Sequence, residues 1–358
     1  MTTTTRKVLA VAAAAIAATL LLLATPAAAQ RSGRGPSRAG RSPVVSPTPS
    51  SEVGGGSPSG RRPTRSAGLT RGNAIDISRF RVAERERRII NGKPVFPGEL
   101  DSGAGFLARF FIDNTDEFYC MGALVTYRSI LTAAHCFHGF EDVALADDVR
   151  IGGIRLYDGF PVDIEKIVLH PDYNPTTFEN DVAVITIKNA PAPARFERNG
   201  LVLARLGYRG RVNTGTVVRQ SGWGATNVNV TQTDPDRMQV AVSPTLLQQT
   251  MVINNMSECN QVVQDVIQIN EVNNPVTHLC GSINDNVAIC SGDSGSPVFT
   301  KSVTRTGSAF YYVEGIVSFS YEGTSADCVP AWPDFYSRVS HYYFFIRRNL
   351  SYRYTLSS

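Results

Sequence analysis

Residues Cys290-Ser291-Gly292-Asp293-Ser294-Gly295-Ser296-Pro297 form the most informative run of this chain. The run places a serine hydroxyl on a tight turn between glycines, and backbone N–H groups in such a turn can bind a negatively charged oxygen. A serine hydroxyl is a poor nucleophile at its ordinary pKa, so it needs a base that takes its proton and a third group that orients the base. Ser294 is therefore a candidate nucleophile if the chain supplies both partners.

Two further motifs supply these partners. His135 stands in Leu131-Thr132-Ala133-Ala134-His135-Cys136, and Asp181 stands in Asn180-Asp181-Val182-Ala183-Val184-Ile185. Each residue alone is a weak signal, because serines between glycines are usually turns, single histidines are usually structural and an aspartate can cap a strand. Their order, with spacings of 46 and 113 residues, favours a catalytic triad of Ser294, His135 and Asp181. We interpret the remaining histidines as structural: His138, His170, His278 and His341.

A fourth motif, Arg87-Arg88-Ile89-Ile90-Asn91-Gly92, precedes the other three. In this order the four motifs resemble the chymotrypsin/trypsin family of secreted serine proteases, and the resemblance covers essentially all of the chain from Ile89 to Ser358. It implies two six-stranded antiparallel β-barrels, over about 89–208 and 209–358, with the active site in the cleft between them. We therefore expect a peptidase domain over 89–358 that hydrolyses peptide bonds through an acyl-enzyme.

The residue pattern independently predicts an all-β protein. Short β-branched and aromatic runs recur between turn signals, which is typical of antiparallel sandwiches or barrels rather than of βαβ units. These runs are 107–112, 123–127, 182–187, 298–300 and 311–319. Only 340–349, at the C-terminus, looks helical, because its apolar residues recur at helical spacing. No internal repeat indicates two barrels independently of the resemblance.

The resemblance also implies roles at the active site. His135 would act as general base and then as general acid, while Asp181 would hold its imidazole in the right tautomer. The backbone N–H groups of Gly292 and Ser294 would form the oxyanion hole. Ser318 matches the family serine that supports the buried aspartate, and the alternative is an ordinary strand serine.

Activation follows from the motif at Arg88. A cut after Arg88 would free the α-amino group of Ile89, which in this family turns inward and pairs with the aspartate beside the nucleophile, here Asp293. Breaking one side of a buried ion pair typically costs several kcal/mol. We therefore expect the uncut chain to be a nearly inactive zymogen.

The specificity pocket is predicted to include Ala288, Ser318, Ser320 and Asp334. Trypsin-type members have an aspartate six residues before the nucleophile, where this chain has Ala288. Asp334, at a position where the family usually has glycine, could neutralise an Arg or Lys side chain instead. Cleavage after Arg or Lys would make Arg87-Arg88 a site for self-cleavage. The alternative is an Asp334 that faces solvent or the backbone, and then a chymotryptic or broad preference.

The first 88 residues are predicted to be removed. Residues 1–29 have the basic, apolar and small-residue order of a secretory signal peptide, and an uncleaved membrane anchor is the alternative. Residues 30–88 contain 13 Arg and four acidic residues but few large apolar residues, so we expect a disordered basic propeptide. Subtracting the +9 of the propeptide and the +2 of the leader from the formal +4 leaves −7 for 89–358. The propeptide is either a solvated spacer or an arm that contacts polyanions.

All six cysteines lie in 89–358, which in an exported chain predicts three disulfides among 15 arrangements. The resemblance implies the pairs Cys120–Cys136, Cys259–Cys280 and Cys290–Cys328. No zinc-type spacing and no convincing acidic calcium cluster is present, so we expect no metal and no cofactor.

The partners that we expect are protein or peptide substrates and an activating protease, with no specific nucleic acid and no stable membrane span. The expected location is extracellular. A non-catalytic binding protein on the same fold remains the competing hypothesis. Because all three triad residues stand in their motifs, the sequence favours the enzyme.

Overall fold

A computed structural model describes residues 92–96, 99, 103–188, 193–208, 210, 212–228, 240–267, 272–283, 285, 287–321 and 332–352. All of them belong to one compact unit. The predicted signal peptide and propeptide, with Arg88, Ile89 and Cys328, lie outside the described residues. No helix in the described part of the chain is long and apolar enough to cross a bilayer.

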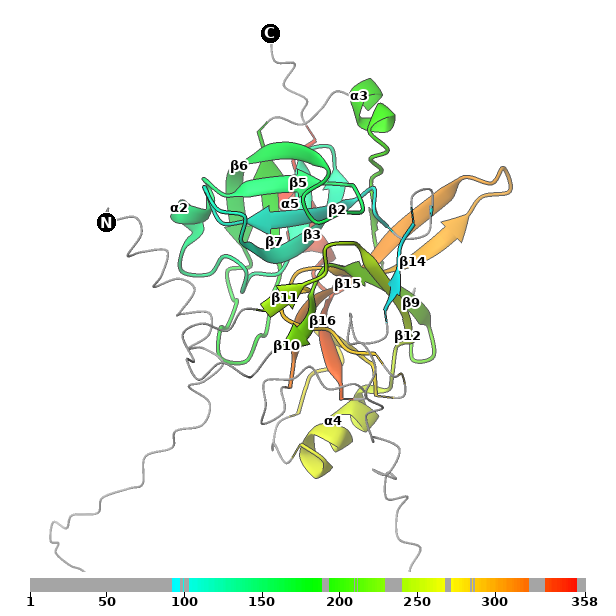
Figure 1. The fold of residues 1–358 in the computed structure, drawn as a ribbon. Coiled ribbons are helices and arrows are strands. Elements are labelled where there is room, and N and C mark those ends of the chain that lie inside the picture. The colour runs from blue at the N-terminus through cyan, green and yellow to red at the C-terminus, as the bar shows by residue number, and fades with distance from the viewer. Residues whose placement is uncertain are drawn as a thin grey trace, which may run out of the picture. The chain divides into compact units, whose positions relative to one another are not determined.

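The first half of the described chain is a closed barrel of antiparallel strands in the order β2-β3-β4-β7-β6-β5 (Figure 1). Its sequence alternates turns with β-branched and aromatic runs, and β7 reads Ala-Val-Ile-Thr-Ile with every residue buried. The strands are β2 (Leu107–Phe111), β3 (Phe118–Thr126), β4 (Ser129–Thr132), β5 (Asp148–Ile151), β6 (Phe160–Leu169) and β7 (Ala183–Ile187).

Most of the second half forms an eight-stranded sheet with the path β1-β12-β9-β14-β15-β16-β13, in which β8 pairs with β15. Its edge strand β1 comes from the N-terminal end of the described chain. β14 and β15 form a long hairpin, drawn in orange in Figure 1. The strands are β1 (Lys93–Pro94), β8 (Arg205–Leu206), β9 (Val217–Gly222), β12 (Leu247–Val252), β13 (His278–Gly281), β14 (Pro297–Val303), β15 (Ala309–Ser320) and β16 (Asp334–Arg338). A separate ribbon pairs β10 (Ala225–Val228) with β11 (Val240–Val242).

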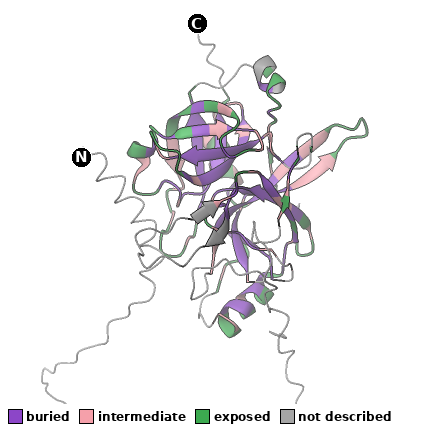
Figure 2. Cartoon of the chain, in the orientation of Figure 1, coloured by how far each residue is buried: buried purple, intermediate pink, exposed green. Residues whose placement is uncertain are grey.

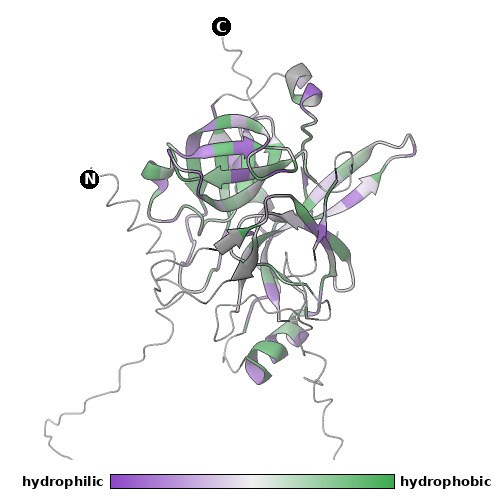
Figure 3. Cartoon of the chain, in the orientation of Figure 1, coloured by the Kyte–Doolittle hydropathy of each residue, from purple (hydrophilic) through white to green (hydrophobic). Residues whose placement is uncertain are grey.

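One cluster of buried apolar side chains includes residues from both halves. Figure 2 colours buried residues purple in the barrel and in the sheet, and Figure 3 colours hydrophobic residues green in both. Phe106, just before β2, packs edge-on against Phe299 of β14 with 5.2 Å between ring centroids, and its ring is tilted against that of Tyr311 of β15 at 5.4 Å. Aromatic pairs of this kind add to the stabilisation that burial alone provides. The barrel and the sheet are therefore packed against each other through side chains, which fixes the positions of the loops at their junction.

The all-β class is confirmed, and each of the five predicted apolar runs lies in or overlaps a strand. The C-terminal helix is confirmed as α5 (Tyr343–Asn349), which begins three residues later than predicted. The prediction that no other segment is helical is wrong, because α2 (Glu141–Ala144), α3 (Pro193–Arg198) and α4 (Met256–Asp265) are also present. In α4, Asn255 caps the first turn by accepting the Ser257 N–H, and the buried residues recur at helical spacing.

Candidate active site

Ser294 lies on the turn that leads into β14. The Asp293 N–H donates to the Cys290 carbonyl at 2.9 Å and closes this turn. Gly295 has a φ of 76°, and a Cβ at this position would overlap the Met121 carbonyl of β3. The turn therefore needs glycine at 295 for its conformation and for its close approach to the barrel.

The same turn is bonded to both halves of the fold. The Met121 N–H donates to the Ser294 carbonyl at 2.8 Å, and the Gly295 N–H donates to the Val317 carbonyl of β15 at 3.0 Å. Within the part of the chain that the structure describes, the backbone N–H groups of Gly292 and Ser294 donate no hydrogen bond. These two groups can therefore donate to a negatively charged oxygen beside Ser294.

His135 follows β4 and is oriented by Asp181. The His135 Nδ1 lies 2.8 Å from Asp181 Oδ2, and the His135 backbone N–H donates to Asp181 Oδ1 at 2.8 Å. A carboxylate only accepts hydrogen bonds, so Nδ1 carries the proton and Nε2 is left as an acceptor. The Asp181 side chain is fully buried and that of His135 is 19% exposed. The pair can therefore present a basic ring nitrogen near the surface.

Asp181 is held in turn by two serines of the second sheet. Ser318 Oγ of β15 donates to Asp181 Oδ2 at 2.5 Å, and Ser337 Oγ of β16 donates to the Asp181 carbonyl at 2.7 Å. Within the described ranges the carboxylate accepts three hydrogen bonds. A buried charge is tolerated when it is hydrogen-bonded in this way.

Ser294 and His135 lie at the same junction without a direct hydrogen bond between their described side chains. A Cβ on Gly295 would lie 3.3 Å from the backbone nitrogen of Ala133, two residues before His135. Contacts between a nucleophile and its base are commonly long before substrate binds.

Asp293 is a second buried carboxyl group beside the nucleophile. Its Oδ1 accepts the Gly224 N–H at 3.0 Å, and its Oδ2 accepts the Cys290 N–H at 3.1 Å. A Cβ on Gly222 or on Gly224 would overlap the carboxyl group, so both glycines are required around it. Burial raises the pKa of Asp293 to about 7, which the two N–H donors only partly oppose. No cationic side chain in the described residues forms an ion pair with it.

Asp334 is buried at the start of β16. Its Oδ2 accepts Ser282 Oγ at 2.5 Å and the Ile289 N–H at 3.1 Å. Burial raises the pKa of Asp334 to about 8. Ser320 lies opposite Asp334 in the β15–β16 register, and Ala288 is buried. Ser318 and Ser320 therefore lie on β15 and Asp334 lies on the neighbouring β16. Ala288 precedes Ile289, whose N–H donates to Asp334.

The profile of the Trypsin family matches residues 89–346. The chain belongs to the trypsin family. Brachyurin from Leptuca pugilator is 30% identical over 240 residues, which cover 66% of this chain and 88% of brachyurin. Chymotrypsin from Phaedon cochleariae is 30% identical over 266 residues, which cover 71% of this chain and 79% of that enzyme. These relatives support serine-type endopeptidase activity for the chain, and the motifs at His135, Asp181 and Ser294 lie within the matched residues.

Solved structures agree at the level of the fold. Neuropsin, a serine protease of mouse brain, superposes with a TM-score of 0.55 at 20% identity, covering 73% of this chain and 99% of neuropsin. Human heparin binding protein superposes with a TM-score of 0.52 at 19% identity, covering 74% of this chain and 99% of that protein. At these identities the likeness extends to the fold alone.

One of the disulfides of this trypsin-family protein lies directly beside His135. Cys120–Cys136 joins β3 to the residue after His135, and Cys259–Cys280 joins α4 to β13. Cys290 is also disulfide-bonded, and its expected partner Cys328 lies outside the described residues. Within the described ranges, Cys120, His135 and Cys136 are the metal-ligating side chains that converge, and both of their sulfurs are already used in a disulfide.

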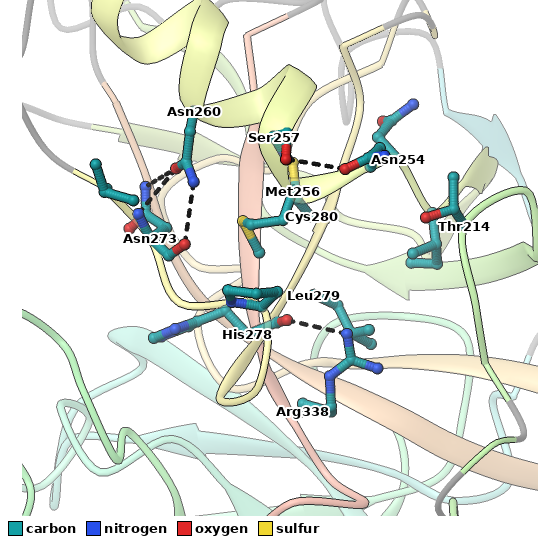
Figure 4. Close-up of a pocket in the computed structure, with 14 residues that line it drawn as sticks. Thr214, Asn254, Met256, Ser257, Asn260, Asn273, His278, Leu279, Cys280 and Arg338 are labelled. Atoms are coloured by element: carbon teal, nitrogen blue, oxygen red, sulfur yellow. Dashed lines mark hydrogen bonds between the residues drawn. The ribbon is translucent and has the colours of Figure 1, made fainter.

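A cavity of about 360 Å³ lies near α4 and apart from the triad (Figure 4). His278 and Arg338 line it, and the Arg338 Nη2 donates to the His278 carbonyl at 3.3 Å. None of the predicted catalytic or pocket residues lines this cavity.

Phe178, Ser282 and Ser337 contact the site and were not predicted from sequence. The Phe178 ring lies edge-on to the His135 ring at 5.8 Å and packs on Phe319 at 5.5 Å. Its position three residues before Asp181 was the only available signal. Ser282 and Ser337 reach their partners across 52 and 156 residues, so no local pattern marks them.

Proposed function

We propose that this trypsin-family chain is a secreted zymogen whose matured form cleaves peptide bonds through Ser294, His135 and Asp181. The observation that carries the proposal is the hydrogen-bonded chain from Ser318 through Asp181 to His135, beside a turn that offers Ser294 and two N–H donors without an acceptor among the described residues.

The mechanism follows from the donors and acceptors. His135 Nε2 takes the proton of Ser294 Oγ as the oxygen attacks the substrate carbonyl carbon. The resulting oxyanion accepts hydrogen bonds from the Gly292 and Ser294 N–H groups, each of which typically lowers the barrier by about 3 kcal/mol. The imidazolium then protonates the leaving amine, and water hydrolyses the acyl-enzyme by the same steps in reverse. Asp181 stays ionised and stabilises the imidazolium.

Activation is proposed to depend on Asp293. Among the described residues, the buried Asp293 carboxyl group has two N–H donors and no cationic partner, and the α-ammonium of Ile89 released by a cut after Arg88 would supply a cation. The Asp293 and Ser294 residues are adjacent, so the same ion pair would hold the oxyanion donors in place. The activating enzyme is either another protease or the matured chain itself.

Specificity is proposed to depend on Asp334 and on pH. An Arg or Lys side chain in the pocket would favour the ionised carboxylate, although two internal donors already bind one of its oxygens. Because the pKa of Asp334 is raised to about 8, cleavage after Arg or Lys should strengthen relative to cleavage after uncharged residues as the pH rises towards 8. A chymotryptic or broad preference is the alternative.

Product sequencing from a mixed peptide library tests the substrate class. The matured chain at pH 6 and pH 9 should cleave the library, and Ser294→Ala should not. Asp334→Gly should lose cleavage after Arg and Lys while it keeps cleavage after apolar residues. Arg and Lys cleavage that survives in Asp334→Gly would support the alternative preference.

Secretion is proposed from residues 1–29, and N-terminal sequencing of the exported chain tests it: the first residue should be Gln30 before maturation and Ile89 after it. The basic segment 30–88 would retain the precursor on a polyanionic resin at low salt if it contacts polyanions. Matured chain should then pass through the same resin.

A further inference from the structure

Arg109 is a buried cation that the proposed chemistry does not use. It stands in the middle of β2, in the apolar run Leu-Ala-Arg-Phe-Phe, and its exposed fraction is 0%. Burial lowers the pKa of its guanidinium to about 9, so the group is still charged at neutral pH. In the described part of the chain no carboxylate forms an ion pair with it. Such a group persists in a core only when other polar atoms replace its water.

Four backbone carbonyls of one loop replace that water. Arg109 Nη1 donates to the carbonyls of Arg155 at 2.6 Å and Leu156 at 3.0 Å. Nη2 donates to the carbonyl of Asp158 at 2.7 Å and to that of Gly152. The loop connects β5 to β6 and is hereafter the 152–159 loop. Its shape is therefore organised around a cation from β2.

The loop is built to close tightly over this cation. Gly159 has a φ of 107°, and a Cβ there would lie 2.5 Å from Arg109 Nη2. Only glycine allows both the backbone conformation and the close approach. Removing the guanidinium would leave these loop carbonyls without the donors that they have now, and a buried carbonyl without a donor is unfavourable.

Trp223 connects this loop to the second sheet. The Arg109 Cζ lies 4.4 Å from the Trp223 ring centroid, which is a cation–π distance. The Trp223 Nε1–H donates to the Ile154 carbonyl of the loop at 3.2 Å, and the Trp223 side chain is fully buried. The indole is therefore fixed from its face by the guanidinium and from its edge by the loop.

The residues on either side of Trp223 surround Asp293. The Gly224 N–H donates to Asp293 Oδ1 at 3.0 Å, and the Ala225 N–H donates to the Ser291 carbonyl at 2.7 Å. A shift of Trp223 would move these donors directly, because they follow it in the chain. The nucleophile turn thus receives two of its hydrogen bonds from the segment that Arg109 and the 152–159 loop hold.

We propose that Arg109 is a positioning residue for the oxyanion donors: its guanidinium holds the 152–159 loop and Trp223, and Trp223 fixes the segment that cradles Asp293. The proposal rests on the proposed function, because its consequence is read in the rate of acyl transfer. It predicts that Arg109 contributes to the transition state more than to substrate binding.

The experiment compares Arg109→Ala and Arg109→Lys with wild type after a cut following Arg88, with rates expressed per titrated active site. Arg109→Ala should lower kcat at least about tenfold, equivalent to about 1.4 kcal/mol, with KM within about twofold. Affinity for a peptide aldehyde, whose adduct places an oxygen between the oxyanion donors, should fall by the same factor as kcat/KM. Arg109→Lys should be intermediate, and millimolar guanidinium should restore part of the Arg109→Ala rate.

The matched control is Arg128→Ala. Arg128 is also a buried arginine of the barrel, but it donates to the Ile187 carbonyl and pairs with Glu165, away from the 152–159 loop. Its loss should lower the melting temperature while kcat per site stays within about twofold, with no rescue by guanidinium. Equal kcat losses in Arg109→Ala and Arg128→Ala, or an unchanged kcat in Arg109→Ala, would overturn the proposal.

The wild-type chain distinguishes a failure of the proposed function from a failure of this inference, and a second pair of variants covers the case in which Arg109→Ala does not fold. A matured wild-type chain without peptidase activity would overturn the proposed function and this inference together. If Arg109→Ala does not fold, Arg109→Lys and Trp223→Phe carry the test. Both should lower kcat with little change in KM, and wild-type kcat in both would contradict the proposal.

Discussion

Replacing Arg88 with Gln keeps the chain uncut and should reveal the cost of burying Asp293 without a cation. The ordinary pKa of 3.8 and the folded value of about 7 differ by an amount equivalent to about 4 kcal/mol. Because the folded pKa is raised, the folded chain binds this proton more tightly than the unfolded chain does. Its stability therefore falls as the pH rises from about 4 to 7.

The matured chain should escape this loss, because the Ile89 ammonium would stabilise the ionised Asp293. The free energy of unfolding should therefore differ little between the two forms at pH 4, and by up to about 4 kcal/mol at pH 7.5, with the uncut form less stable. This value is an upper limit, since the uncut chain can lower the cost by releasing the Asp293 turn towards solvent. That release would also dismantle the oxyanion donors and explain an inactive precursor.

Urea unfolding between pH 4 and pH 8 measures the difference, with Ser294→Ala in both forms to prevent self-digestion and an added protease to cut after Arg88. Asp334, whose pKa is also raised, is present in both forms, so its contribution cancels from the difference in the free energy of unfolding. Asp293→Asn in both forms should remove the pH dependence of the difference. A difference that does not change with pH, or an uncut form as stable as the matured one at pH 7.5, would contradict an ion pair between Ile89 and Asp293.

Three further predictions follow from the site. Ser318→Ala removes the hydroxyl that donates to Asp181. Because a hydrogen bond to a charged group is worth about 1.5–3 kcal/mol, kcat should fall about 10- to 100-fold. An unchanged kcat in steady-state kinetics would count against the role of Ser318. Gly295→Ala forces a Cβ into the barrel backbone, so both activity and melting temperature should fall, and a wild-type melting curve would contradict that packing. Replacing Cys259 and Cys280 together with Ser removes a disulfide beside α4 and should cost about 2–5 kcal/mol in denaturant unfolding, while kcat per active site stays within about twofold.

The motifs around His135, Asp181 and Ser294 can be recognised in the sequence because each residue stands in a distinctive local run, and a serine nucleophile requires a base and a group that orients the base. Their catalytic role stays a prediction. The strand runs were readable because β-branched and aromatic residues cluster between turns. By contrast, α4 was missed although Asn255 is a good helix cap, because its buried residues are few and its remaining face is polar. Arg109 gave no signal at all, since its partners are backbone carbonyls more than 40 residues away, and a carbonyl has no residue type.

The most direct test of the central claim is covalent labelling by a sulfonyl fluoride, located by mass spectrometry. The matured chain should take up one label per molecule at Ser294, with loss of peptidase activity in proportion, and the Arg88→Gln chain should react far more slowly. The account is contradicted if the matured chain is not labelled at Ser294, or if the uncut chain reacts at the same rate.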